Sequence, residues 1–517
     1  REDLRSAQTR RVTPAVADPG ALRSEWTMPL AFGLDHALYA SYQQVFRTRD
    51  GGAHWDAISP DLTRLPPPGE KRRGVVYALA PSPRAANVVW AGTDDGLVHV
   101  TRDGGKRWAN VTPPGVSAWA HVAGIEASHF DARGAYVAVD RHRLDDDRPY
   151  LYVTHDGGRS WRAATSGIPD GSFLNAVRED PVRPGLLYAA TESGVFVSFD
   201  DGGSWRSLRL NMPVVSVRDL AVRDGDLAIA THGRAFWILD DVEPLRQLAA
   251  DPAGGARLFA PRAAVRVRAG HDEAEASPPE TPLGENPPSG AYLDYVVPPG
   301  AHGPLALTVA DAHGGTLRRW SSDDRVPAPD ASKLAFPAYW LVRAQPPSAA
   351  PGMHRFVWDF ATRAGEDAPL APPGRYAVRL TLDGRTYTQP LAVRRDPRVR
   401  ASDADLAAQY ALARGVDVLR ARLGTAIAAA AAARAKPGAD VARIDAIAGP
   451  PAGADSGAPP SAAARTTTLR AYAEALAELE ATLESADTAP TKDERATWSR
   501  LRAGADAALR AWSALRG

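Results

Sequence analysis

One eight-residue pattern, with an acid and a tryptophan around small residues, occurs four times in this chain. The copies are TRDGGAHW from Thr48, TRDGGKRW from Thr101, THDGGRSW from Thr154 and SFDDGGSW from Ser198, and all four fit S/T-x-D-x-G-x-x-W. Their aspartates are 53, 53 and 44 residues apart, a period typical of the four-stranded sheet that forms one propeller blade or a similar unit. This repeated octet is therefore the main indication of the fold.

Each octet follows short apolar segments of the same kind. Around the second copy these are VVYALAPS, NVVWAGTDDG, LVHVTRD and RWANVT, which indicate four strands joined by tight turns. The octet is then the turn between the third and fourth strands. There the aspartate can accept hydrogen bonds from backbone N–H groups two residues on, the glycines can take positive φ, and the tryptophan can fold onto the blade edge. We predict a structural role for the aspartate and tryptophan of each octet: Asp50, Trp55, Asp103, Trp108, Asp156, Trp161, Asp200 and Trp205.

The strand count leaves one blade incomplete. A fifth unit, VRDLAVRDGDLAIATHGRAFWILDD, supplies three strands and continues into VEPLRQL without an octet. Near the start, RRVTPAV matches WANVTPPGV, which is a fourth strand. Residues 11–16 could complete the fifth blade and close a ring of five. We favour the alternative, in which the chain is the rear part of a larger propeller completed by an N-terminal segment or a second chain.

The octets and their flanks resemble the Asp-box, or BNR-repeat, propellers, which include sialidases, oligoxyloglucan-type glycoside hydrolases, the sortilin luminal domain and a photosystem assembly factor. WAGTDDGLVHVTRDGGKRW, VREDPVRPGLLYAATESGVFVSFDDGGSW and THGRAFWILDDVEPLRQL are similar to large bacterial proteins labelled glycosyl hydrolase or sortilin-like. The resemblance implies a periplasmic or secreted protein. It carries over the octet residues alone, because no motif matches the arginine triad or tyrosine nucleophile of a sialidase.

Ligands of propellers usually bind at the end that holds the turns between the second and third strands and the connections between blades. Glycoside hydrolysis usually needs two carboxyl groups, and Asp94 or Asp95 could form such a pair with Glu192. The polar and aromatic candidates for ligand binding at this end are Arg141, Arg143, His232, Arg234 and Trp119. Asp145, Asp146 and Asp147 could hold calcium, but we favour a solvated cluster partnered by the flanking arginines.

Composition excludes several other functions. Lysine plus arginine and aspartate plus glutamate both number 61, so no overall charge attracts nucleic acid. The chain has no cysteine, which removes thiol nucleophiles and zinc–thiolate sites. The longest apolar run, AIAAAAAARA, is too short to span a bilayer. We expect no cofactor.

The remaining sequence predicts three further segments after a propeller at residues 1–248. Residues 249–290 are rich in proline and indicate a linker. Residues 291–396 alternate apolar and polar positions, which favours an immunoglobulin-like sandwich. Residues 397–517 contain helical stripes that include Leu419, Leu476 and Trp512, and we predict a bundle packed within one chain rather than against another subunit.

Two functions agree with this sequence. In the first, which we favour, the propeller binds a peptide, protein or glycan on its loop-rich end. In the second, it is a glycoside hydrolase that uses carboxylates at that end. No serine–histidine motif, HExxH motif or phosphate-binding glycine loop occurs.

Overall fold

The computed structural model describes residues 2–516 except 17–19, 21, 66–72, 251–254, 269–277, 282–283, 285, 327, 342–344, 366–367 and 451–466. The chain forms two compact units, Arg1–Pro252 and Ala253–Gly517.

The first unit contains five antiparallel sheets, here called blades 1 to 5, whose strands follow one another in chain order. Blade 1 comprises β3 (Leu30–Phe32), β4 (Leu38–Ser41), β5 (Val45–Thr48) and β6 (Asp56–Ala57). Blade 2 comprises β7 (Val76–Pro81), β8 (Val89–Thr93), β9 (Val98–Thr101) and β10 (Ala109–Asn110). Blade 3 comprises β11 (His121–Ala127), β12 (Ala135–Arg141), β13 (Asp146–Thr154) and β14 (Arg162–Ala163).

Blade 4 comprises β15 (Leu174–Glu179), β16 (Leu187–Thr191), β17 (Gly194–Ser198) and β18 (Arg206–Ser207). Blade 5 has three strands, β19 (Val217–Arg223), β20 (Asp226–Thr231) and β21 (Phe236–Leu239), and is followed by the helix α1 (Glu243–Ala250). A short hairpin of β1 (Glu2–Asp3) and β2 (Gln8–Thr9) precedes blade 1.

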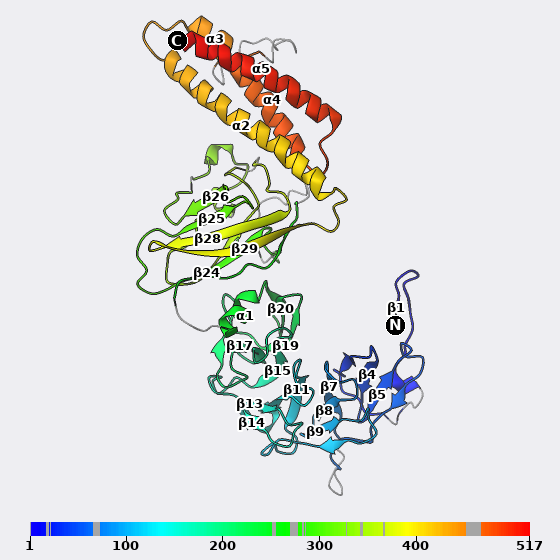
Figure 1. Cartoon of the computed structure of the whole chain (residues 1–517). Coiled ribbons are helices and arrows are strands. Elements are labelled where there is room, and N and C mark those ends of the chain that lie inside the picture. Colours follow the sequence, from blue (N-terminus) through cyan, green and yellow to red (C-terminus); the bar gives the residue numbers. More distant parts are fainter. Residues whose placement is uncertain are drawn as a thin grey trace. The chain divides into compact units, whose positions relative to one another are not determined.

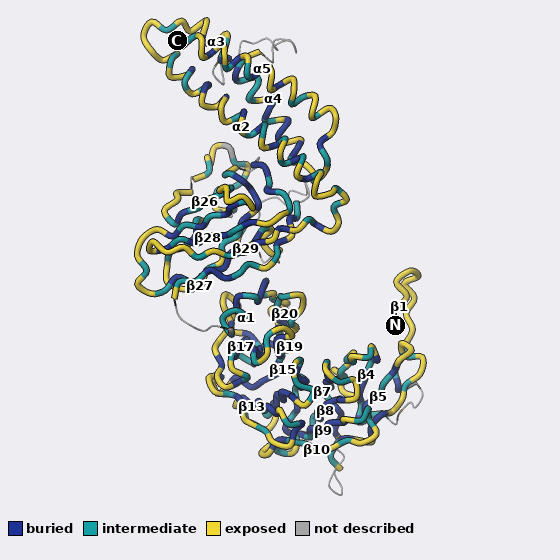
Figure 2. Tube along the Cα trace, in the orientation of Figure 1, coloured by how far each residue is buried: buried dark blue, intermediate teal, exposed yellow. Residues whose placement is uncertain are grey.

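The blades pack face to face, and shared apolar clusters join each blade to the next. β8 and β16 are buried along their whole length because neighbouring blades cover both faces. Successive four-stranded sheets that pack in this way form a β-propeller. Figure 1 shows blades 1 and 5 at the two ends of an arc, and Figure 2 shows that buried residues concentrate in the blades between them. The five-blade ring closed through residues 11–16 is not formed.

Each octet forms a turn held by its own side chains. In blade 3 the Thr154 hydroxyl donates to Asp156 Oδ1 at 2.9 Å and accepts from the Gly158 N–H at 2.9 Å. Asp156 Oδ1 also accepts from the Ser160 N–H at 3.0 Å. The expectation of a bond two residues on is wrong, because two glycines at positive φ carry the chain round to bring Ser160 back to the carboxylate.

In blades 2 to 4 the tryptophan of the octet bonds to the preceding blade rather than to its own. The indole N–H of Trp161 donates to the backbone oxygen of Val111, directly after β10, at 2.8 Å. The same bond is made by Trp108 to Ile58 at 2.8 Å and by Trp205 to Ala164 at 2.7 Å. An octet therefore staples two blades together.

The second unit begins with two sheets packed around one apolar core. The smaller sheet contains β22 (Arg257–Leu258), β24 (Ala291–Val297) and β27 (Gly352–Trp358). The larger contains β23 (Ala264–Arg266), β29 (Arg385–Arg395), β28 (Gly374–Leu382), β25 (Ala306–Ala310) and β26 (Thr316–Ser321), in that order. Residues 249–290, expected as a linker, thus supply two short strands; much of the rest of that segment lies outside the described residues. The immunoglobulin likeness stays a prediction.

In the described residues after the sandwich, the helices are α2 (Asp403–Arg434), α3 (Val441–Ala448), α4 (Leu469–Leu483) and α5 (Lys492–Arg516). The predicted stripes share one core within the chain, and Leu419, Leu476 and Trp512 are all buried there. Packing within the chain is therefore confirmed. No helix in the described part of the chain is both long and apolar enough to cross a membrane.

A buried ion pair joins the sandwich to the helices. Arg266, at the end of β23, contacts Asp487 Oδ1 at 2.5 Å, and the two side chains are 2% and 3% exposed. Arg268 also contacts Asp487, at 3.1 Å. Charges so deeply buried need such partners because both have lost their water.

Replacing Trp161 with phenylalanine is expected to lower the free energy of unfolding by about 1–2 kcal/mol, because the ring stays but the Val111 carbonyl loses its donor. Urea denaturation followed by fluorescence measures the change. Trp237→Phe is the matched control, since that indole bonds within its own hairpin to Arg234 and is not a staple. Equal losses in the two variants would contradict the staple.

Asp487→Leu is expected to cost about 3–5 kcal/mol, because Arg266 is left as a buried charge without its carboxylate. Adding Arg266→Met should restore most of that loss. The control is the exposed pair Arg422–Asp506, whose removal should change stability by less than about 1 kcal/mol. Denaturation followed by far-UV circular dichroism reports on the helices. A double variant no more stable than Asp487→Leu alone would contradict this account.

Candidate functional site

The loop-rich end of blade 3 carries an organised group of polar side chains. β12 ends at Arg141, a single 3-10 turn spans His142–Leu144, and Asp145 takes a φ of 57° before β13 begins. This four-residue connection is as long as those of blades 2 and 5 and longer than those of blades 1 and 4. Through the His142 ring it reaches Phe173 in the connection that enters blade 4.

Asp140 and His142 form a hydrogen-bonded pair at the base of this turn. Asp140 is 5% exposed. Its carboxylate contacts His142 Nδ1 at 2.6 Å and accepts from the His142 backbone N–H at 2.8 Å. The imidazole also stacks on Phe173 of the next connection, with 4.8 Å between centroids and 17° between planes. With Nδ1 and one ring face engaged, Nε2 is the nitrogen that can meet a ligand.

His121 lies beside this pair at the start of β11. It is opposite Asp140 in the strand register, and its ring packs edge-on against Tyr77 with centroids 4.1 Å apart. Burial lowers the pKa of His121 to about 4; Asp140 acts in the opposite direction, and Arg143, His142 and Arg218 lower the pKa further. Within the described residues its Nε2 has no hydrogen-bond partner. His121 is therefore a neutral group at physiological pH.

Trp119 precedes His121 and has an unusual backbone. Its φ is 65°, in the left-handed region that bulky residues rarely adopt. Its N–H donates to the Asp95 oxygen at 3.0 Å, which ties the turn of blade 2 to the connection entering blade 3. Such conformations cost about 1–3 kcal/mol and cluster at functional sites.

The carboxylates predicted for hydrolysis hold the backbone of the loop-rich end. Asp95 is fully buried and accepts from the Arg64 N–H at 2.8 Å and the Thr93 hydroxyl at 2.5 Å. Asp94 accepts from the Val75 N–H at 2.8 Å, and burial raises its pKa. Glu192 accepts from the Ser216 hydroxyl at 2.6 Å. Their catalytic role stays a prediction.

The charged residues on both sides of the turn between β12 and β13 pair with one another. Arg148 binds Asp146 with two bonds of 2.9 Å, which is the main cause of the low pKa of Asp146. Arg141 lies 3.5 Å from Asp146 and over the Tyr150 ring. Asp145 and Asp147 are exposed. Among the residues the structure describes, no three His, Cys, Asp or Glu side chains gather as metal ligands.

The other predicted binding residues are exposed at the same end of their blades. Arg143 lies in the turn between β12 and β13, and His232 and Arg234 lie in the turn between β20 and β21. The His232 N–H donates to the Ser216 oxygen at 2.8 Å. Sequence reasoning missed Asp140 and Phe173. The spacing of Asp140 and His142, two residues apart, could have indicated the pair.

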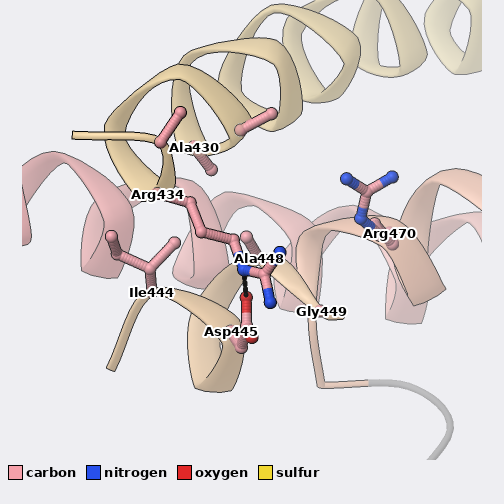
Figure 3. Close-up of a pocket in the computed structure, with 9 residues that line it drawn as sticks. Ala430, Arg434, Ile444, Asp445, Ala448, Gly449 and Arg470 are labelled. Atoms are coloured by element: carbon pink, nitrogen blue, oxygen red, sulfur yellow. Dashed lines mark ion pairs between the residues drawn. The ribbon is translucent and has the colours of Figure 1, made fainter. Parts of the chain in front are cut away.

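A hollow of about 310 Å³ lies among the helices of the second unit (Figure 3). Figure 3 shows Ala430, Ile444 and Ala448 on its walls and the ion pair of Arg434 with Asp445, at 3.1 Å, beside it. Arg470 stands at its edge. This lining brings together no pair of groups for catalysis, so the loop-rich end of blade 3 is the stronger candidate.

His121 is expected to destabilise the fold as pH falls. The unfolded chain protonates this histidine near the ordinary histidine pKa of 6.5, whereas the folded protein holds it neutral to about 4. Between these values the unfolded state binds more protons, so stability is present above pH 6.5 and declines toward pH 4, by on the order of 2–3 kcal/mol. His121→Gln should flatten this decline in urea titrations, whereas His54→Gln, at an exposed position, should not. An unchanged slope in the His121 variant would contradict the assignment.

No family model and no curated protein matches this chain. Among solved structures it is similar to a GH74 xyloglucanase from Xanthomonas campestris, with 14% identity and a TM-score of 0.32 over 41% of this chain and 34% of that one. It is similar to an ancestral GH74 enzyme with 13% identity and a TM-score of 0.32 over 72% and 46% of the two chains. It is also similar to YCF48 from Cyanidioschyzon merolae, with 19% identity and a TM-score of 0.25 over 34% of this chain and 55% of that one. The chain thus covers less than two thirds of each of these proteins.

Proposed function

We propose that the loop-rich end of the propeller blades binds a peptide, protein or glycan, in the periplasm or outside the cell. The observation that carries this proposal is the Asp140–His142 pair stacked on Phe173. A buried carboxylate orients the imidazole and a neighbouring blade supports its face, so the ring is preorganised without any ligand. Preorganisation favours binding because less side-chain freedom is lost when a ligand arrives.

Apolar side chains at the same end support a macromolecular ligand. Three apolar side chains are exposed there: Leu144 in the turn between β12 and β13, and Leu210 and Val214 in the connection to blade 5. Leu210 also has a positive φ of 50°. Exposed apolar groups around oriented polar ones are typical of surfaces that bind protein or sugar. Arg143 adds a cation, which favours a ligand with an acidic group.

Hydrolysis has weaker support from this geometry. A glycosidase needs one carboxyl group that can give its proton to the leaving oxygen and another that can reach the sugar or a water. Asp95 is fully buried, and Asp94 and Glu192 each accept a hydrogen bond from a neighbouring segment of the propeller. These bonds give all three carboxylates a structural function at the loop-rich end.

Trp119→Gly and His142→Phe test the binding site. Glycine tolerates the φ of 65°, so the first variant should keep its stability to within about 1 kcal/mol, since relief of strain offsets lost packing. His142→Phe keeps the stack on Phe173 but removes Nε2. Each variant should weaken binding of the best-bound members of a glycan array and a peptide library by at least about tenfold.

Phe130→Ala is the matched control, because Phe130 is a partly exposed aromatic in the turn between the first two strands of blade 3, at the opposite end. The Phe130→Ala variant should bind the same glycans and peptides with the affinity of the parent protein. Unchanged affinity in Trp119→Gly and His142→Phe would place the binding site elsewhere. Glycan cleavage by the parent protein that is lost in Asp94→Asn or Glu192→Gln would replace this proposal with a hydrolase.

A further inference from the structure

The N-terminal tail occupies the place of a fourth strand from a blade that precedes blade 1. The Trp55 indole donates to the Val12 oxygen at 2.7 Å, as Trp161 donates to Val111 at 2.8 Å. A Cβ on Gly52 would lie 2.8 Å from the Val12 side chain, and one on Gly158 would lie 2.7 Å from Val111. Both contacts of the staple are therefore present at Val12. In blades 1 to 3 the residue in this position directly follows the fourth strand.

The hairpin of β1 and β2 ends at Thr9, just before residues 10 and 11, which match the fourth strand Ala109–Asn110 when Val12 is aligned with Val111. β2 pairs antiparallel with β1, with Glu2 opposite Thr9 and Asp3 opposite Gln8. Figure 1 shows the hairpin extending away from blade 1, and its residues are exposed. The other strands of the blade that precedes blade 1 are not found among the described residues.

The two ends of the arc both expose apolar blade faces. On the inner strand of blade 1, Leu30 is 70% and Phe32 is 76% exposed. On β21 of blade 5, Phe236 is 79% and Ile238 is 54% exposed. The equivalent third strand of blade 4, β17, is buried throughout. β21 pairs with β20, and within the described part of the chain no strand pairs with its other edge.

A hollow of about 450 Å³ lies between the tail and blade 1. Leu22, Phe46 and Trp55 line it together with the tail residues that end at Pro14. An exposed sheet edge and an uncovered apolar face are the features that natural sheets cover with further structure. At both ends of this arc, the structure that fits is another blade.

We propose that a propeller segment outside residues 1–517 docks on both ends of the arc and completes the ring. At one end it supplies the other strands of the blade whose fourth-strand position is held by residues 10 and 11, and it packs that blade against Leu30 and Phe32. At the other end it supplies the fourth strand beside β21 and covers Phe236 and Ile238. The completed ring places additional loops around the ligand-binding end, but the proposal does not depend on the binding function.

A second copy of the chain fits these surfaces less well. Completing blade 5 requires a fourth strand whose pairing edge is available. In blades 1 to 4 the fourth strand is outermost and has one neighbour. Residues 10–14 of the tail line the hollow beside blade 1 of their own chain, and the Val12 oxygen accepts from the Trp55 indole there. The tail of this chain, like that of a second copy, is therefore already held at its own blade 1 and is not available to blade 5.

Photo-crosslinking in the natural host tests the proposal on the full chain. The crosslinking amino acid p-benzoylphenylalanine replaces Phe236 in one variant and Phe32 in another. Both should give crosslinked products whose peptides come from outside residues 1–517 and whose sequence shows the four-strand repeat of a propeller. Intact mass and N-terminal sequencing of the purified material then show whether that segment belongs to the same polypeptide or to another.

Charged substitutions provide a second readout. Phe236→Lys with Ile238→Lys should reduce the crosslink from Phe32 at least about tenfold if one segment bridges both ends. Val182→Lys, at another exposed apolar position in blade 4, should leave the yield of the crosslink from Phe32 unchanged. Crosslinks between Phe236 and the Leu30 face of a second copy would overturn the proposal in favour of a self-assembled ring. A natural species with the mass of 517 residues and no crosslinks would overturn it as well.

Discussion

The bond from the octet tryptophan to the backbone of the preceding blade is the interaction on which the first unit depends. The bonds that join the octet's hydroxyl, its carboxylate and the following N–H groups are local, and such bonds would form a turn in any hairpin of this sequence. The indole bond instead spans 41 to 50 residues and fixes the position of one blade against the last. Because the donor and the acceptor recur with each blade, the same geometry is copied along the chain.

This arrangement separates the two ends of the propeller. At the octet end the glycines are fixed by close contacts, such as that of Gly158 with Val111, so that end can vary little. At the other end the turns between second and third strands carry no staple, and they range from two residues in blade 4 to four residues in blades 2, 3 and 5. The candidate site lies at the turn of blade 3, which forms a single 3-10 turn. A repeat that is rigid at one end thus leaves the other free for recognition.

The sequence predicted the repeat, its blades and the helical stripes because each depends on residues close together in the chain. It also predicted the fourth-strand character of the tail, since Val12 and Val111 stand in matching segments. It could not predict partners that are distant in sequence. Asp95 bonds to Arg64, 31 residues away, and no local pattern distinguishes that buried carboxylate from an exposed one in an Asp-Gly turn. The stack of His142 on Phe173 likewise joins two blades and has no signature within either.

The same limit applies to the second unit, where Arg266 meets Asp487 across 221 residues. A buried ion pair of this kind adds little stability compared with apolar residues of the same shape, because both charges lose their water. Its geometry is nevertheless demanding: the guanidinium of Arg266 also donates to the Ala371 oxygen at 3.2 Å, and Arg268 approaches the same carboxylate. An apolar contact would tolerate a helix pair that slides along the sandwich, whereas these directed bonds do not. We interpret the pair as the feature that fixes where the helices join the sandwich, while the leucine stripes supply the energy that folds them.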